Sequence, residues 1–150
     1  MTAQTSEILS YEGRLLAMES HPLSAYFAGG GRNPGFSGPH SGCWRGYVAT
    51  WEILENRLYL RALKGWLGGA IRVDLSAVFP NSSEGVLADW FTGQIKCPLG
   101  AGKEVIYGLF EHPSHLVLLI EKGVLQHVDE VVNPDFDDLP EYDYGDEIPF

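Results

Sequence analysis

Apolar and polar residues alternate most regularly in the middle of the chain. Every second residue of 47–54 is apolar, and 57–63 repeats the alternation after the polar pair Glu55-Asn56. A period of two places alternate side chains on opposite sides of a strand, and a polar pair between two such runs is typical of a tight turn. The segment therefore predicts a β-hairpin. Its second face is also partly apolar, which suggests some cover on both sides.

Shorter runs predict the remaining elements. Further strands are expected over 7–11, 14–18, 88–97, 103–110, 115–121 and 124–132. A brief helix is predicted over 22–28 with Ser20 as its cap, and Asp74 is expected to cap a single turn over 75–79. Residues 29–42 contain six Gly and two Pro, which indicates a long loop.

These elements predict a mainly β fold with one or two short helices. The connections are too short for several crossover helices, so most strands are expected to pair antiparallel. A single domain built on a curved sheet or an open barrel is the first choice, and an α+β sheet with one covering helix is the second. A length of 150 residues fits one domain.

Composition places the chain among globular proteins. The apolar share is 45%, and no apolar run reaches the roughly 18 residues of a membrane span. The first residues have neither a basic end nor a hydrophobic stretch, so no secretory signal is expected. Two cysteines, Cys43 and Cys97, are too few for a disulfide scaffold and favour a reducing cytoplasm.

Negative charge is concentrated at the C-terminal end. The chain carries 20 acids and 10 bases, but residues 1–128 carry 11 acids and 10 bases, and no Lys or Arg follows Lys122. The chain therefore divides into a nearly neutral β-rich body, 1–132, and an acidic tail, 133–150. The missing basic face argues against nucleic acid as a direct ligand, because phosphate contacts require cations.

The tail mixes acids with aromatic residues, which a purely solvating tail does not need. A disordered solubility tail is one reading. The other is an extended peptide that docks on a basic groove, steered by charge and held by its aromatic rings. On that reading the partner-binding residues are Asp135, Phe136, Asp137, Asp138, Glu141, Tyr142, Asp143, Tyr144, Asp146 and Glu147.

Residues with reactive side chains form no strong catalytic or metal motif. His40 and Cys43 lie close together, with Arg45 in position to stabilise a thiolate, but no nucleophile-elbow motif accompanies them. His112 and His115 have ligand-like spacing without the paired cysteines of a zinc knuckle. We therefore predict no catalytic residue, no metal and no cofactor, and favour a protein that is not an enzyme.

Three phrases of the sequence resemble a group of small, uncharacterised bacterial proteins. They are Cys43-Trp-Arg-Gly-Tyr-Val-Ala-Thr-Trp-Glu-Ile53, Ala88-Asp-Trp-Phe-Thr-Gly-Gln-Ile95 and Leu118-Leu-Ile-Glu-Lys-Gly123. In size and acidity the chain also resembles immunity proteins of polymorphic toxin systems. That resemblance implies a cytoplasmic protein that binds and neutralises a cognate bacterial toxin.

Three functions remain open at this point. The first is toxin neutralisation, in which the acidic tail covers a basic cleft of the partner. The second is a small-molecule binder or enzyme with a sheet pocket lined by Trp51, Trp90 and Tyr59 and gated by the loop 29–42. The third is a regulatory subunit whose tail binds its own body or a second copy, and the oligomeric state stays open.

Overall fold

The computed structural model describes residues 5–38, 43, 45–68, 71–82, 84–107 and 109–143. In chain order its elements are β1 (Glu7–Tyr11), β2 (Arg14–Met18), α1 (Pro22–Ala28), β3 (Tyr47–Leu54), β4 (Arg57–Leu67), β5 (Ile71–Val73), the 3₁₀ turn η1 (Leu75–Ala77), β6 (Val86–Leu87), β7 (Gly93–Leu99), β8 (Lys103–Ile106), β9 (Leu109–Glu111), β10 (Ser114–Glu121), β11 (Val124–Val132) and the 3₁₀ turn η2 (Phe136–Asp138).

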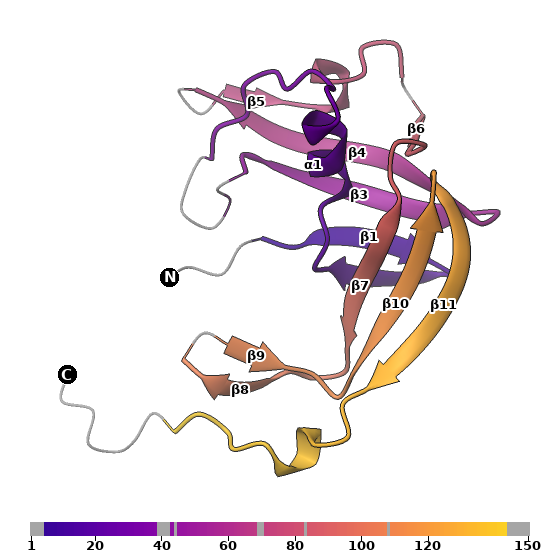
Figure 1. Cartoon of the computed structure of the whole chain (residues 1–150). Coiled ribbons are helices and arrows are strands. Elements are labelled where there is room, and N and C mark those ends of the chain that lie inside the picture. The colour runs from indigo at the N-terminus through magenta and orange to yellow at the C-terminus, as the bar shows by residue number, and fades with distance from the viewer. Residues whose placement is uncertain are drawn as a thin grey trace.

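The described part of the chain is mainly β, as the alternation predicted. Its strands form one mixed, nine-stranded sheet in the order β2-β1-β3-β4-β11-β10-β7, with β5 and β6 also paired to β4. The hairpin β8–β9 forms a separate small sheet at one end of the molecule (Figure 1). The large sheet curves strongly without closing into a barrel.

One strand pair in the large sheet is parallel. β1 runs parallel to β3, with Leu9 opposite Trp51, whereas all other pairs are antiparallel in the described residues. Parallel neighbours need a long crossover. Here the crossover leaves β2, passes through α1 and the glycine-rich segment, and returns to the sheet at β3.

The main hairpins turn through two residues with positive φ. Glu12-Gly13, Glu55-Asn56 and Lys122-Gly123 all have φ between 48° and 80°. Two successive positive φ values are typical of type I′ turns, whose twist matches that of the flanking strands. The predicted hairpins at 7–18, 47–63 and 115–132 are therefore confirmed, and β4 continues to Leu67.

The core lies inside the curve of the sheet. Trp51, Leu58, Leu60, Ile95 and Leu118 are fully buried and come from four different strands. An aromatic cluster extends this core beneath α1, where the rings of Phe79 and Trp90 stack with centroids 5.8 Å apart. The rings of Tyr26, Phe27 and Phe36 pack against the same core.

Two of the predicted strands were wrong in their limits. The strand expected over 88–97 begins at Gly93, because Ala88 starts a turn in which its carbonyl accepts the Phe91 amide at 3.1 Å. The single strand expected over 103–110 is the hairpin β8–β9.

Ser20 is not the cap of the helix. The N-cap position belongs to His21, which makes no side-chain capping bond. The Ser20 hydroxyl instead donates to the carbonyl of Gln94 in β7 at 3.1 Å. The cap predicted for Asp74 is confirmed, since its carboxylate accepts the Ser76 amide. No helix within the described residues has the length and apolar character needed to cross a membrane.

Candidate protein-binding surface

Exposed apolar side chains gather at the end of the molecule that carries β8 and β9. Ile106, Tyr107, Leu109 and Phe110 are each about half exposed or more, with Tyr107 at 70%. The end of β11 adds Val131 and Val132, because Ser114, at the base of the hairpin, pairs with Val132. Large apolar side chains clustered in this way on a surface commonly mark an interaction site.

The described part of the acidic tail lies against this hairpin (Figure 1). The ammonium of Lys103, in β8, donates to the carbonyls of Phe136 and Leu139 at 3.0 and 3.1 Å. The same ammonium sits 4.8 Å from the centre of the Phe136 ring. A cation that satisfies two carbonyls and an aromatic face fixes the turn η2 on the hairpin. We call this set of contacts the Lys103 clamp.

A second set of contacts holds the tail further along. The Tyr142 amide donates to the Glu104 carbonyl at 2.5 Å, and the Tyr142 ring meets the Tyr107 ring edge-on at 6.0 Å. Two of the predicted aromatic anchors, Phe136 and Tyr142, are therefore half-buried against the protein's own hairpin. The turn η2 was not among the predicted elements.

The predicted acids of the tail face solvent. Asp135, Asp137, Asp138, Glu141 and Asp143 are all exposed. Within the described residues, the first four take part in no ion pair. Asp129 and Glu130 in β11 are also exposed. Tyr144, Asp146 and Glu147 lie outside the described residues, so the structure does not place them.

This surface combines apolar contact area with excess negative charge. The hairpin supplies side chains that gain free energy when a partner covers them, at about 25 cal/mol per Å² of apolar area. The four tail acids that form no ion pair within the described residues, Asp135, Asp137, Asp138 and Glu141, attract a positive surface. We refer to the β8–β9 hairpin, the end of β11 and tail residues 133–143 together as the acidic end.

The suspected nucleophile cluster around Cys43 is not assembled in the described residues. Cys43 is buried, and its thiol donates to the Tyr47 carbonyl at 3.6 Å. Arg45 is directed to the carboxylate of Glu7 at 3.2 Å instead of the thiol. His40 lies outside the described residues.

Sequence reasoning missed Glu7, the most buried charged residue in the part of the chain that the structure describes. Its carboxylate is fully buried, accepts a hydrogen bond from the Trp51 indole at 2.9 Å, and pairs with Arg45. Its second oxygen lies 3.8 Å from Nδ1 of His21. A buried charge needs such partners, so this group is a structural link between β1, β3 and the segment before β3.

The His112 and His115 rings meet edge-on with centroids 6.0 Å apart, but each imidazole has its own polar neighbour. His112 Nδ1 lies 3.1 Å from the Gly100 carbonyl, and His115 Nε2 lies 3.1 Å from Glu19. Across the ranges that the structure describes, no three His, Cys, Asp or Glu side chains are grouped to hold a metal. Burial raises the pKa of the Cys97 thiol to about 11, which keeps it protonated and unreactive at neutral pH.

The three residues predicted to line a sheet pocket do not surround one cavity. The Trp51 and Trp90 rings meet edge-on with centroids 6.5 Å apart, but Tyr59 lies away from them. Trp51 is fully buried in the core, and Trp90 donates its indole N–H to the Pro22 carbonyl at 2.9 Å. Tyr59 lies on the opposite face of β4 from the buried Leu58 and Leu60, and its ring faces the Arg61 guanidinium at 4.9 Å.

Comparison of the chain with protein-family models, with curated proteins and with solved structures finds no match.

Proposed function

We propose that this chain is a protein-binding module that uses its acidic end to cover a basic surface of a partner protein. The observation that carries the proposal is the Lys103 clamp, which lays acidic residues beside the exposed apolar hairpin. Apolar anchors surrounded by a polar, charged rim are the usual anatomy of a specific interface. Neither feature serves the protein's own core.

The partner class follows from the charge. Unpaired carboxylates favour a partner with a basic surface, and proteins that act on polyanions need basic clefts. We therefore propose that the partner is a toxin with such a cleft and that binding blocks it, which is the action of an immunity protein. This proposal extends to a bacterial, cytoplasmic setting in which the two free thiols stay reduced.

The charged and the apolar residues of this surface are expected to affect different rate constants. Exposed carboxylates such as Asp137 and Asp138 act mainly through long-range attraction, so they raise the association rate and make it sensitive to salt. Phe110 and Ile106 act only after contact, so they lower the dissociation rate. The two groups can therefore be tested separately.

The test uses the full chain as bait in lysate of its native cell, followed by kinetics with the purified partner. We expect D135N/D137N/D138N to lower the association rate about tenfold at low salt, and Phe110→Ser to raise the dissociation rate about tenfold. The control is E55Q/E121Q, which removes exposed acids from the turn before β4 and from the end of β10.

A second readout addresses neutralisation. The purified partner should act on a polyanionic substrate and lose that activity when the wild-type chain is added. Partner binding that both surface variants leave unchanged would remove the acidic end from the mechanism. A partner that binds without any loss of its activity would leave a binding module but refute the immunity role.

A further inference from the structure

The outer face of β3, β4 and β5 carries a second group of polar and aromatic side chains. Its charged residues are cations, whereas those of the acidic end are mostly acids. Alternate residues of a strand share a face, so Ala62, Lys64 and Trp66 project to the same side of β4. The strand register brings in the neighbours: Val48 lies opposite Lys64, Thr50 opposite Ala62, and Arg72 opposite Trp66.

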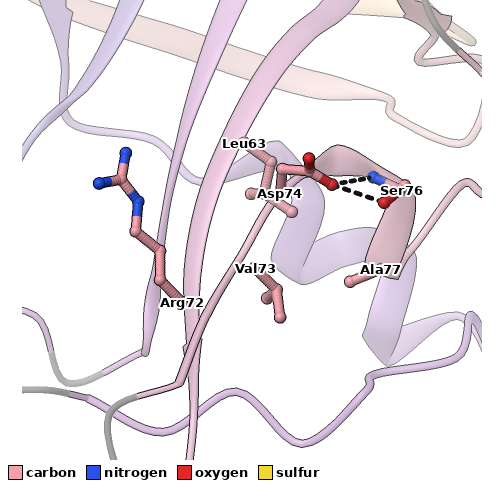
Figure 2. A pocket seen from close by; sticks show the side chains of 6 residues that line it. All are labelled: Leu63, Arg72, Val73, Asp74, Ser76 and Ala77. Atoms are coloured by element: carbon pink, nitrogen blue, oxygen red, sulfur yellow. Dashed lines mark hydrogen bonds between the residues drawn. The ribbon is translucent and has the colours of Figure 1, made fainter.

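These side chains line a hollow of about 570 Å³, which is within the size range of small-molecule sites. The buried Cys43 and the exposed Thr5 complete its border. A neighbouring hollow of about 650 Å³ shares Leu63 and Arg72 with it, so the two lie side by side. Figure 2 shows this second hollow and the Arg72 side chain at its edge.

Two cations, Lys64 and Arg72, border the hollow. Within the described residues, neither Lys64 nor Arg72 makes an ion pair. Asp74 follows β5 directly, and its Oδ1 accepts the Ser76 amide at 3.0 Å and the Ser76 hydroxyl at 2.5 Å. In Figure 2 the Arg72 guanidinium points away from that carboxylate. Two positive charges that make no ion pair within the described residues therefore flank one hollow of a protein with net charge −10.

The other residues that line the hollow indicate which groups a ligand would carry besides its negative charge. The half-exposed indole of Trp66 follows Lys64 on the same face of β4 and lies opposite Arg72, and it offers a flat face on which a ring can stack. The Thr50 hydroxyl lines the same hollow and has no hydrogen-bond partner within the described residues. A guanidinium and an ammonium together favour a doubly charged phosphate, since arginine binds its oxygens in a fork and lysine adds a point charge.

We propose that this hollow binds a small phosphate ester that carries a flat ring, with the phosphate between Lys64 and Arg72 and the ring on Trp66. Nucleoside monophosphates are the common molecules of this chemistry. A nucleic acid strand does not fit the proposal, because its many phosphates would meet the acidic charge of the whole chain. A single phosphate responds to the local pair of cations within a Debye length of about 8–10 Å.

The test titrates each of the four common nucleoside 5′-monophosphates into the full-length protein by calorimetry. At least one should bind with a Kd below about 1 mM. The matching nucleoside and inorganic phosphate should each bind at least about tenfold more weakly, because each lacks one of the two contacts.

Variants then locate the site. Lys64→Gln and Arg72→Gln should each weaken the nucleotide about tenfold, and Trp66→Leu should reduce its affinity to that of inorganic phosphate. Arg57→Gln is the matched control, since Arg57 is an exposed cation at the other end of β4 and should leave the affinity unchanged. Lys64 and Arg72 are exposed, so their variants are expected to fold, and thermal unfolding checks this.

Two results would overturn the proposal. The first is the absence of saturable binding by any of the four nucleotides up to about 10 mM. The second is an equal loss of affinity in Arg57→Gln and Arg72→Gln, which would mean attraction to scattered charge and no built site. Neither result bears on the acidic end, because the two surfaces share no residue.

Discussion

Gly123 occupies the second position of the β10–β11 turn, with φ of 80°, and lies against the chain at Ala88. A Cβ at this position would be 2.8 Å from the Ala88 carbonyl oxygen, closer than real Cβ atoms approach. The backbone cannot simply shift, because the Gly123 amide donates to Phe91 and its carbonyl accepts from Leu58. The residue is therefore restricted by its conformation and also by its neighbours.

Gly13 provides a matched comparison, since it has φ of 76° in an equivalent turn with open space around it. We expect Gly13→Ala to cost about 1–2 kcal/mol, the price of a left-handed conformation for an L-residue. Gly123→Ala should cost at least about 1 kcal/mol more, because the close contact is added. Urea unfolding of both variants measures the difference, and equal losses would contradict it.

At the same scale, Glu7 shows what alternation in a sequence does not reveal. The pattern around Glu7 predicted the strand correctly, but nothing in it indicated that the carboxylate would be buried. Its burial depends on Arg45 and the Trp51 indole, which are distant in sequence and are brought to it by the parallel pairing of β1 with β3. A partner supplied by tertiary structure leaves no local signal.

Elements with a regular period and a two-residue turn were predicted to within a residue, except that β4 continues past 63 to Leu67. The errors occur where buried and exposed side chains alternate although the backbone is not paired as in a strand. In 88–92 Ala88 is buried and Trp90 is partly buried, so the pattern resembles a strand, but the backbone forms a turn. The run of apolar residues in 103–110 was interpreted as one strand, which overlooked the glycine at position 108 in the sequence. The structure has two paired strands there instead.

The tail is the element whose sequence was most informative about charge and least informative about position. Its acids were correctly expected to be concentrated at one end. The hairpin on which it lies was not foreseen, because Lys103 gave no sign in the sequence that it would bind two tail carbonyls. The clamp depends on the turn η2 presenting both carbonyls to one ammonium.

Replacing this lysine tests how firmly the tail is held. Lys103→Met keeps the apolar stem of the side chain and removes the charge and its donors, so the tail should open more often. We expect hydrogen exchange at the Tyr142 amide, which donates to the Glu104 carbonyl, to accelerate about tenfold. Lys96→Met on the exposed face of β7 is the control. Unchanged exchange at Tyr142 would show that the clamp does not hold the tail.

On the scale of the whole molecule, the two edge strands of the large sheet, β2 and β7, approach each other. The end of β2 approaches β7, where the Glu19 amide donates to the Lys96 carbonyl at 2.9 Å. Curvature of this kind brings the two edges of the sheet together and leaves few backbone groups unpaired at that end. Sequence patterns predicted a curved sheet or open barrel, but which edges would meet depended on the crossover through α1.

The side chain of Ser20, which follows β2, forms two hydrogen bonds to β7 and so connects the two edges of the sheet. Its hydroxyl donates to the Gln94 carbonyl at 3.1 Å and accepts the Lys96 amide at 3.3 Å. Ser20→Ala removes both bonds, so we expect a loss of about 1 kcal/mol in the free energy of unfolding and faster hydrogen exchange at the Lys96 amide. The control is Ser10→Ala in β1, whose hydroxyl has no partner within the described residues. If the Lys96 amide exchanges equally fast in wild type and Ser20→Ala, the bond from the Glu19 amide to the Lys96 carbonyl is enough to hold the two edges of the sheet together, and the Ser20 bonds are not required.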